Sequence, residues 1–151
     1  MRFLLLFLLS INFAFAQQKG KIVRVKDGDS YQFLAENNQL IEIRLYGVDC
    51  PEHDQPMSKE IVRFVKKKTL NQTVTIQKIS IDKYKRTVAN VILADNSNLA
   101  ELLLRNGWAW HYKKYDKNPN WTNLELIARK KKIGIWKMTN PVAPWEWRKA
   151  H

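Results

Sequence analysis

The sequence contains a single cysteine, Cys50. An intramolecular disulfide is therefore impossible, and a hydrophobic core must hold the fold even in an oxidising compartment. After residue 16 no stretch is long and apolar enough to span a bilayer, which needs about 20 consecutive apolar residues. Internal repeats and low-complexity linkers are also missing. A chain of 151 residues without these features suits one domain with a single core.

Acidic residues are scarce: 14 Asp and Glu stand against 26 Lys and Arg, for a net charge of +12. A small and strongly basic domain favours an anionic partner, either nucleic acid or an anionic surface. A charged solubilising surface is the alternative reading. The lysine runs at 66–68 and 130–132 are expected to end helices, where cations suit the helix dipole and also attract polyanions.

The first 16 residues have the pattern of a secretory signal peptide. Arg2 supplies the charged start, an apolar run follows, and Ala14-Phe15-Ala16 forms a small-x-small cleavage site. A membrane anchor is the competing reading, but the apolar run is too short for a span. We expect cleavage before Gln17, which makes 17–151 the mature domain and places it in the periplasm or outside the cell.

The few acids gather with arginines in short segments. Asp29, Asp49 and Glu52 offer hard oxygen ligands suited to a divalent metal ion. Arg44 and Arg86 offer planar guanidinium forks suited to a phosphate group. The ensemble has the character of a site that cleaves phosphodiesters, although each segment alone is common.

These segments resemble the staphylococcal nuclease family. The order and approximate spacing of four motifs carry the resemblance, which covers about residues 20–136 and leaves a tail at 137–151 rich in tryptophan and proline. The motifs are Val25-Lys26-Asp27-Gly28-Asp29-Ser30, Arg44-Leu45-Tyr46-Gly47-Val48-Asp49-Cys50-Pro51-Glu52, Asp82-Lys83-Tyr84-Lys85-Arg86 and Gly134-Ile135-Trp136.

The pattern of the chain indicates a β-rich α+β domain. Strands are expected at 22–25, 31–34, 41–45, 73–76 and 87–93. Helices are expected after Ser58 as N-cap, at 98–106, and where the apolar residues Leu124, Ile127 and Ala128 recur. Trp108, Trp110 and Tyr112 alternate along a further expected strand, with Trp108 in the core. Five strands with about three helices suit a small closed barrel, although pattern alone leaves other α+β folds open. The resemblance implies the five-stranded oligonucleotide/oligosaccharide-binding (OB) barrel. Alternation of Ile41, Ile43 and Leu45 with polar residues places Arg44 opposite the aliphatic core.

The resemblance implies a role for each polar residue of the motifs. Asp29, Asp49 and the backbone carbonyl of Cys50 would hold Ca²⁺, which accepts six to eight oxygens at flexible distances. Glu52 would act as the general base or orient the attacking water. Arg44 and Arg86 would bind the phosphate and stabilise the charge that grows on it during attack. The implied activity is hydrolysis of DNA and RNA to 3′-phosphates with little sequence preference.

Three further residues are candidates for substrate binding. Tyr112 and Tyr115 lie near the positions where tyrosines flank the nucleotide in the family, and aromatic rings can stack on bases. Lys85 stands where the family prototype has glycine, just before Arg86. It could add a phosphate contact, or it could displace Arg86 if the turn requires a positive φ.

Other interpretations compete with these roles. Asp27-Gly28 could form only a hairpin turn, Glu52 could cap the following helix, and Arg44 could form a surface salt bridge with Glu42 or Glu52. A nucleophilic Cys50 with His53 as its base is a further possibility. For the whole protein, the alternatives are a non-catalytic nucleic-acid-binding barrel and a basic surface-adhesion protein. We expect a monomer with no stable protein partner and no membrane segment in the mature form.

Overall fold

The computed structural model describes residues 17–151. The predicted signal peptide at 1–16 lies outside the described residues, so its cleavage remains a prediction. None of the helices formed by the described residues has the length and apolar character needed to cross a membrane. The elements, in chain order, are β1 Gln17–Val25, β2 Ser30–Ala35, β3 Leu40–Leu45, β4 Val48–Asp49, α1 Ser58–Thr69, β5 Thr73–Ile81, β6 Thr87–Ile92, α2 Leu99–Arg105, β7 Trp110–His111, α3 Pro119–Lys130, the 3₁₀ helix η1 Gly134–Lys137 and α4 Pro144–Ala150.

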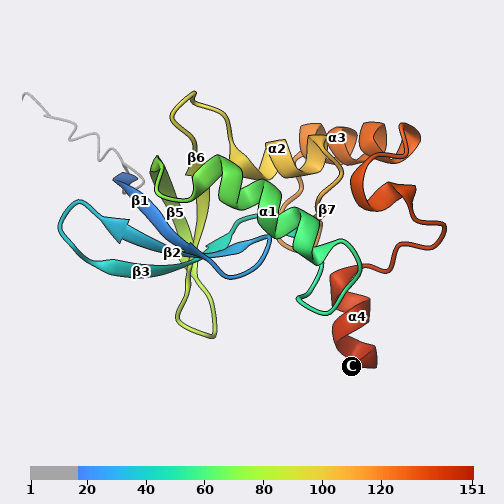
Figure 1. Ribbon diagram of the computed structural model, residues 1–151, viewed down its shortest axis with the longest axis horizontal. Helices are drawn as coiled ribbons and strands as arrows, with labels where there is room; N and C mark the ends of the chain where they lie inside the picture. Colours follow the sequence, from blue (N-terminus) through green and yellow to red (C-terminus); the bar gives the residue numbers. More distant parts are fainter. Residues whose placement is uncertain (1–16) are drawn as a thin grey trace, which may run out of the picture.

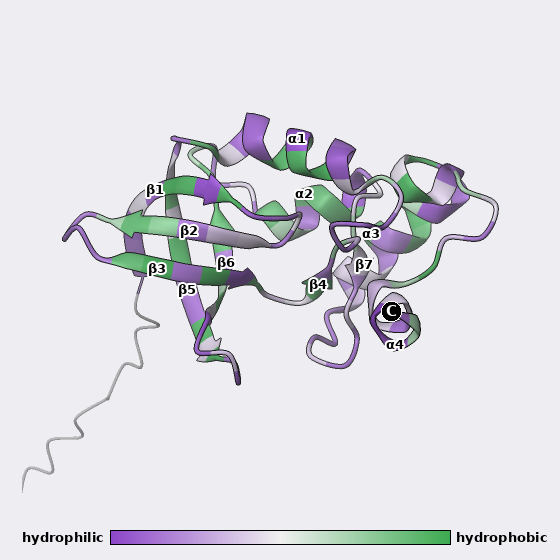
Figure 2. Cartoon of the chain, turned by 60° about the horizontal axis from the view of Figure 1, so that its bottom comes forward, coloured by the Kyte–Doolittle hydropathy of each residue, from purple (hydrophilic) through white to green (hydrophobic). Residues whose placement is uncertain are grey.

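Five strands close into a barrel in the order β1-β2-β3-β6-β5, which confirms the predicted barrel. Helices α2, α3 and α4 gather toward one end of it (Figure 1). Apolar and polar segments alternate along β3 (Figure 2). Ile43 and Leu45 are buried in the core, as their period-two spacing predicts.

The strand register brings the candidate residues to one region of the barrel. In the antiparallel β2–β3 pair, Ser30 lies opposite Arg44, so Asp29 immediately precedes the partner of the arginine. Strand β3 runs parallel to β6 and pairs Ile43 with Thr87, which places Arg86 at the same end. The short strand β4 pairs with β7 and carries Asp49.

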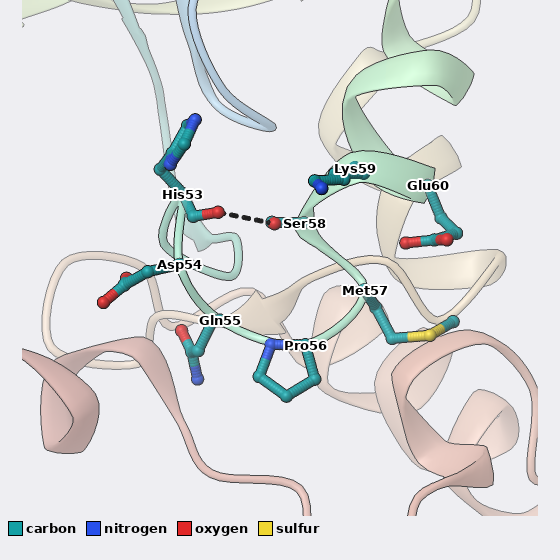
Figure 3. A pocket seen from close by; sticks show the side chains of 8 residues that line it. All are labelled: His53, Asp54, Gln55, Pro56, Met57, Ser58, Lys59 and Glu60. Carbon is teal, nitrogen blue, oxygen red and sulfur yellow. Dashed lines mark hydrogen bonds between the residues drawn. The ribbon is translucent and has the colours of Figure 1, made fainter.

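Helix α1 begins differently from the prediction. Ser58 was expected to cap the helix, but Met57 occupies the cap position with φ of 72°, and Ser58 is already helical. The Ser58 hydroxyl instead donates to the carbonyl of His53 at 2.8 Å (Figure 3). The prediction is wrong because the tight loop before the helix uses this hydroxyl to satisfy its own backbone.

Residues 17–151 form four α-helices where about three were expected. The additional one is α4 in the proline-containing tail, which starts at Pro144 because proline is compatible with the first turn of a helix. Helix α2 agrees with the prediction, with Gly107 following it at φ of 67°. In α3 the predicted inward residue Ile127 is 40% exposed, and the buried face carries Trp121, Glu125 and Ala128.

The predicted alternating strand through Trp108, Trp110 and Tyr112 shortens to the two residues of β7. Trp110 is buried and packs edge-on against Trp136, with ring centroids 5.0 Å apart. Trp108 is only partly buried and packs near Phe64. Packing from α3 and η1 replaces strand pairing here, so the burial pattern does not follow period two.

Candidate active site

The loop between β1 and β2 positions Asp29. The carboxylate of Asp27 accepts a hydrogen bond from the Asp29 N–H at 3.0 Å, and the Tyr31 hydroxyl donates to the carbonyl of Gly28. A Cβ atom at Gly28 would come within 2.6 Å of the Cβ of Cys50. Glycine is therefore required because the loop packs directly against the segment that carries Cys50. Asp27 makes the turn, and Asp29 is left to face the site.

A single guanidinium holds the two carboxylates predicted as metal ligands. Arg44 Nη1 lies 3.1 Å from Asp29 Oδ2, and Nη2 lies 2.8 Å from Asp49 Oδ1. Nη1 also donates to the carbonyls of Leu45 and Val48, both at 3.0 Å. The Arg44 side chain is only 15% exposed. The alternative of a surface salt bridge with Glu42 or Glu52 is wrong, because the arginine is turned inward to the two aspartates.

Burial sets the electrostatics of this cluster. Loss of hydration raises the pKa of Asp29 to about 8, although the Arg44 charge and the Cys50 N–H act in the opposite direction. Burial alone would lower the pKa of Arg44, but Asp29 and Asp49 raise it on balance. Because a nearby positive charge favours the ionised form of a carboxyl, a cation bound beside Asp29 would oppose the rise in the pKa of Asp29.

Glu52 is held by a residue from the far end of the chain. Arg148 in α4 contacts Glu52 Oε1 through Nη1, and its Nη2 lies 2.9 Å from Asp49 Oδ2. The hydrogen bonds to these carboxylates raise the pKa of Arg148 above its ordinary value, against the effect of burial. The alternative that Glu52 caps α1 is wrong, because the helix begins six residues later and the carboxylate points to α4. Sequence reasoning missed Arg148, and its position in the tail gives no local signal.

Arg86 lies at the end of a turn in which Lys85 adopts a positive φ. Lys85 adopts φ of 64°, the left-handed conformation that glycine would supply. Asp82 Oδ2 then accepts from Arg86 Nε at 2.8 Å, and Arg86 Nη1 lies 3.5 Å from the Ser30 hydroxyl. Lys85 therefore adopts the positive φ itself, and Asp82 anchors the Arg86 that follows it. Lys85 itself is exposed, so its predicted phosphate contact remains a prediction.

Cys50 has a structural position that rules out the thiol-nucleophile hypothesis. The residue is 3% exposed, and burial raises the pKa of its thiol well above the ordinary value. His53, the proposed base, is exposed in the following loop. The backbone N–H of Cys50 donates to Asp29 Oδ2 at 2.6 Å, so this residue helps to fix the aspartate.

The two tyrosines proposed to bind substrate lie together. Tyr112 and Tyr115 pack edge-to-face with ring centroids 4.9 Å apart, and Tyr115 is 60% exposed. Tyr112 is stacked on Trp145 of α4, with centroids 5.2 Å apart and planes 8° apart. A hollow nearby is lined by aromatic and basic side chains, among them Lys113, Lys114 and Lys149.

The residues present are compatible with a weakly bound oxygen-preferring metal ion. Among residues 17–151, no three His, Cys, Asp or Glu side chains converge on a common point. Two carboxylates are available, and Asp29 Oδ1 makes only a long contact of 3.4 Å with Ser30. Ca²⁺ tolerates such a set because water and substrate oxygens can complete its coordination.

Several known proteins with a similar sequence are named as nucleases. The family model described as "Staphylococcal nuclease homologue" matches residues 42–138. An "Uncharacterized endonuclease" of Escherichia coli O157:H7 is 33% identical over 145 residues, covering 96% of this chain and 94% of the relative. The "Micrococcal nuclease" of Shigella flexneri is 30% identical over 91% of this chain and 84% of its own length.

A plant relative extends the comparison. The "Staphylococcal-like nuclease CAN1" of Arabidopsis thaliana is 37% identical over 79% of this chain, which corresponds to 38% of the larger plant protein. The barrel, the motif spacing and these matches agree. The chain therefore belongs to the staphylococcal nuclease family, a family of endonucleases.

Proposed function

We propose that this protein is a calcium-dependent nuclease that hydrolyses phosphodiester bonds of DNA and RNA with little sequence preference. The observation that carries the proposal is the contact of one arginine, Arg44, with both buried aspartates, Asp29 and Asp49. Arginines and carboxylates in one partly buried cluster suit an anionic substrate whose charge increases during reaction.

Asp29, Asp49 and the carbonyl of Cys50 would hold the metal ion. When bound, Ca²⁺ would polarise a phosphate oxygen and bring substrate and water together. Asp29 and Asp49 are buried and both contact Arg44, so their carboxylate oxygens lie close together, and this set of oxygen donors supports the assignment. Mg²⁺ is expected to support less turnover because it demands a tighter octahedral shell.

The protein side chains divide the remaining chemistry. Glu52 accepts a proton from the attacking water, whose oxygen bonds to phosphorus while the bond to the 5′-oxygen breaks. The 5′-oxygen takes up a proton from solvent and leaves as a 5′-hydroxyl, and the phosphate stays on the 3′-oxygen. Arg44 and Arg86 bind the nonbridging oxygens of the phosphate and stabilise their additional charge. The ion pair with Asp82 supports a fixed position for the Arg86 guanidinium, and its partial exposure leaves it accessible to a phosphate.

Recognition of the substrate would rest on charge and stacking. The net charge of +12 and the lysines around Tyr112 attract phosphates without reading bases. The exposed ring of Tyr115 is available to stack on a base, whereas the ring of Tyr112 is already stacked on Trp145. Lys85 would contribute one further phosphate contact from its exposed turn.

We further propose that the protein is secreted or periplasmic and acts as a monomer. The signal-like pattern of residues 1–16 supports the first statement, and the second rests on the completeness of the polar cluster within one chain. A non-catalytic binding barrel and a surface-adhesion protein are the competing functions. The presence of all five polar residues, Asp29, Arg44, Asp49, Glu52 and Arg86, argues for an enzyme.

The test is cleavage of defined DNA and RNA oligonucleotides by the purified protein, with Ca²⁺, with Mg²⁺ and with excess chelator. We expect cleavage of both polymers with Ca²⁺, 3′-phosphate ends on the products, and loss of cleavage in chelator. Activity that persists in chelator would exclude the calcium assignment. Metal-independent binding of both polymers without any cleavage would favour the adhesion or binding-module alternatives.

A further inference from the structure

The loop that carries Glu52 is joined to the C-terminal segment by side-chain hydrogen bonds at two neighbouring loop residues. Gln55 Nε2 donates to the carbonyl of Val142 at 2.7 Å, and Trp147 Nε1 donates to Asp54 Oδ1 at 3.1 Å. The loop and α4 therefore lie side by side, although about ninety residues separate them in sequence (Figure 1). This docking is independent of the contacts that Arg148 makes.

Two other contacts fix α4 itself. Trp145 stacks on Tyr112, and Pro144 at the start of the helix is buried. The hollow in front of the loop is lined by residues 53–60 and does not include Glu52 (Figure 3). Glu52 faces α4 instead, where Arg148 is presented from the second turn of the helix.

Arg148 joins the candidate base to a candidate metal ligand. Nη1 donates to Glu52 Oε1 and lies 3.3 Å from Asp49 Oδ1, and Nη2 donates to Asp49 Oδ2 at 2.9 Å. Asp49 has a side chain only 2% exposed, whereas that of Glu52 is 35% exposed. Within residues 17–151, Arg148 is the residue that binds the Glu52 carboxylate. It therefore links the partly exposed Glu52 to the buried Asp49.

We propose that Arg148 is a positioning residue that holds the Glu52 carboxylate in place for the reaction. The inference rests on the proposed nuclease function. A glutamate side chain loses rotamer entropy when it is fixed in one position. A general base must lie within hydrogen-bond reach of the water it deprotonates, so holding it there beforehand favours the reaction. Arginine suits this task because its planar fork can bond two carboxylates at once, which a lysine ammonium does less well.

A double-mutant cycle tests the inference: wild type, Arg148→Ala, Glu52→Gln and the double variant are compared by kcat and KM with saturating Ca²⁺. Arg148→Lys tests conservative rescue. Arg63→Ala is the matched control, because it removes an exposed arginine that pairs with Glu60 on α1 and not with Glu52. Calcium affinity by calorimetry and urea unfolding confirm that each variant is folded and binds the metal.

We expect Arg148→Ala to lower kcat by about 10-fold or more with KM changed by less than about 2-fold. In the Glu52→Gln background the same substitution should lower kcat by less than about 2-fold, because the base that it positions is already disabled. Arg148→Lys should recover part of the loss, Arg63→Ala should match wild type in kcat, and Ca²⁺ should still bind to Arg148→Ala.

Each other outcome contradicts the inference in a recognisable way. A rise in kcat for Arg148→Ala would make α4 an inhibitory cover. Equal losses in both backgrounds with a raised KM would make Arg148 a phosphate ligand. Unchanged kinetics in an active enzyme would reduce it to a surface ion pair. Absence of cleavage by the wild type would instead refute the proposed nuclease function.

Discussion

The carboxylate of Asp82 holds the guanidinium of Arg86, four residues along the chain. Asp82 Oδ2 accepts from Arg86 Nε at 2.8 Å, while Oδ1 accepts from the backbone N–H of the same residue at 2.9 Å. The turn between β5 and β6 is thereby closed and the arginine oriented in one arrangement. Stability of the turn and placement of a candidate catalytic group are consequently linked.

Asp82→Asn is expected to destabilise the protein in a pH-dependent way. Burial alone would raise the pKa of Asp82, but hydrogen bonds and charge from Arg86 lower it on balance. A lowered folded-state pKa gives stability that is present above the unfolded value, near 3.8, and lost as the pH falls through the folded one. We expect a loss of about 1 kcal/mol near neutral pH, measured by urea unfolding.

The difference between wild type and Asp82→Asn should shrink as the pH falls below the ordinary range of aspartate. Asp95→Asn is the matched control, because Asp95 closes a comparable turn through Ser97 and has no arginine partner. A constant difference at all pH values would show that the charge of Asp82 does not stabilise the turn.

Lys85→Gly is expected to stabilise the protein. Lys85 has φ of 64°, and a non-glycine residue in this region costs roughly 1 kcal/mol. Part of that gain is offset by the larger entropy of glycine in the unfolded chain, so we expect about 0.5 kcal/mol. Thermal and urea unfolding measure the change. Lys83→Gly, in the same turn but without a positive φ, should not stabilise, and a gain there would remove the backbone explanation.

Arg44→Lys is expected to lower kcat by about 100-fold or more while the protein remains folded. Lysine keeps the positive charge but cannot contact Asp29 and Asp49 with separate nitrogens of a rigid fork. The assay is cleavage of a DNA oligonucleotide with saturating Ca²⁺. Arg63→Lys serves as control, since Arg63 forms an exposed pair with Glu60 on α1. Retention of most turnover by Arg44→Lys would return this arginine to a structural role.

Binding of nucleic acid is expected to depend on salt and hardly on sequence. With a net charge of +12, affinity should come mainly from phosphate contacts that release counterions. For a cleft that holds a few phosphates, log K should fall with log salt with a slope on the order of −2 to −4. Fluorescence anisotropy with the Glu52→Gln variant and several single-stranded oligonucleotides measures this slope. Salt-independent binding, or a strong preference for one sequence, would indicate a dedicated recognition module.

Local sequence pattern predicted much of the barrel. Alternation around Ile43 and Leu45 identified β3 and turned Arg44 away from the aliphatic core, because successive strand residues point to opposite faces. The turn at Asp27-Gly28 could also be predicted locally, because Asp and Gly are residues that favour turns. The motif spacing indicated the family, which the comparisons confirmed.

Packing decided the features that local pattern could not. The inward face of α3 carries Trp121 and Glu125 rather than Ile127, because the surrounding elements, and not helical period alone, choose which residues are covered. Lys85 takes a left-handed conformation that its residue type disfavours, because the Asp82–Arg86 contacts close the turn around it.

The sequence by itself identified Asp29, Arg44, Asp49 and Glu52 as candidate site residues, since their types and spacing are properties of the chain. Only the tertiary structure decided that Arg148 lies on Glu52 and Asp49. Residues almost a hundred positions apart meet because the barrel closes and α4 docks beside the loop after β4. No local periodicity encodes such a contact, because it depends on the packing of elements that form separately.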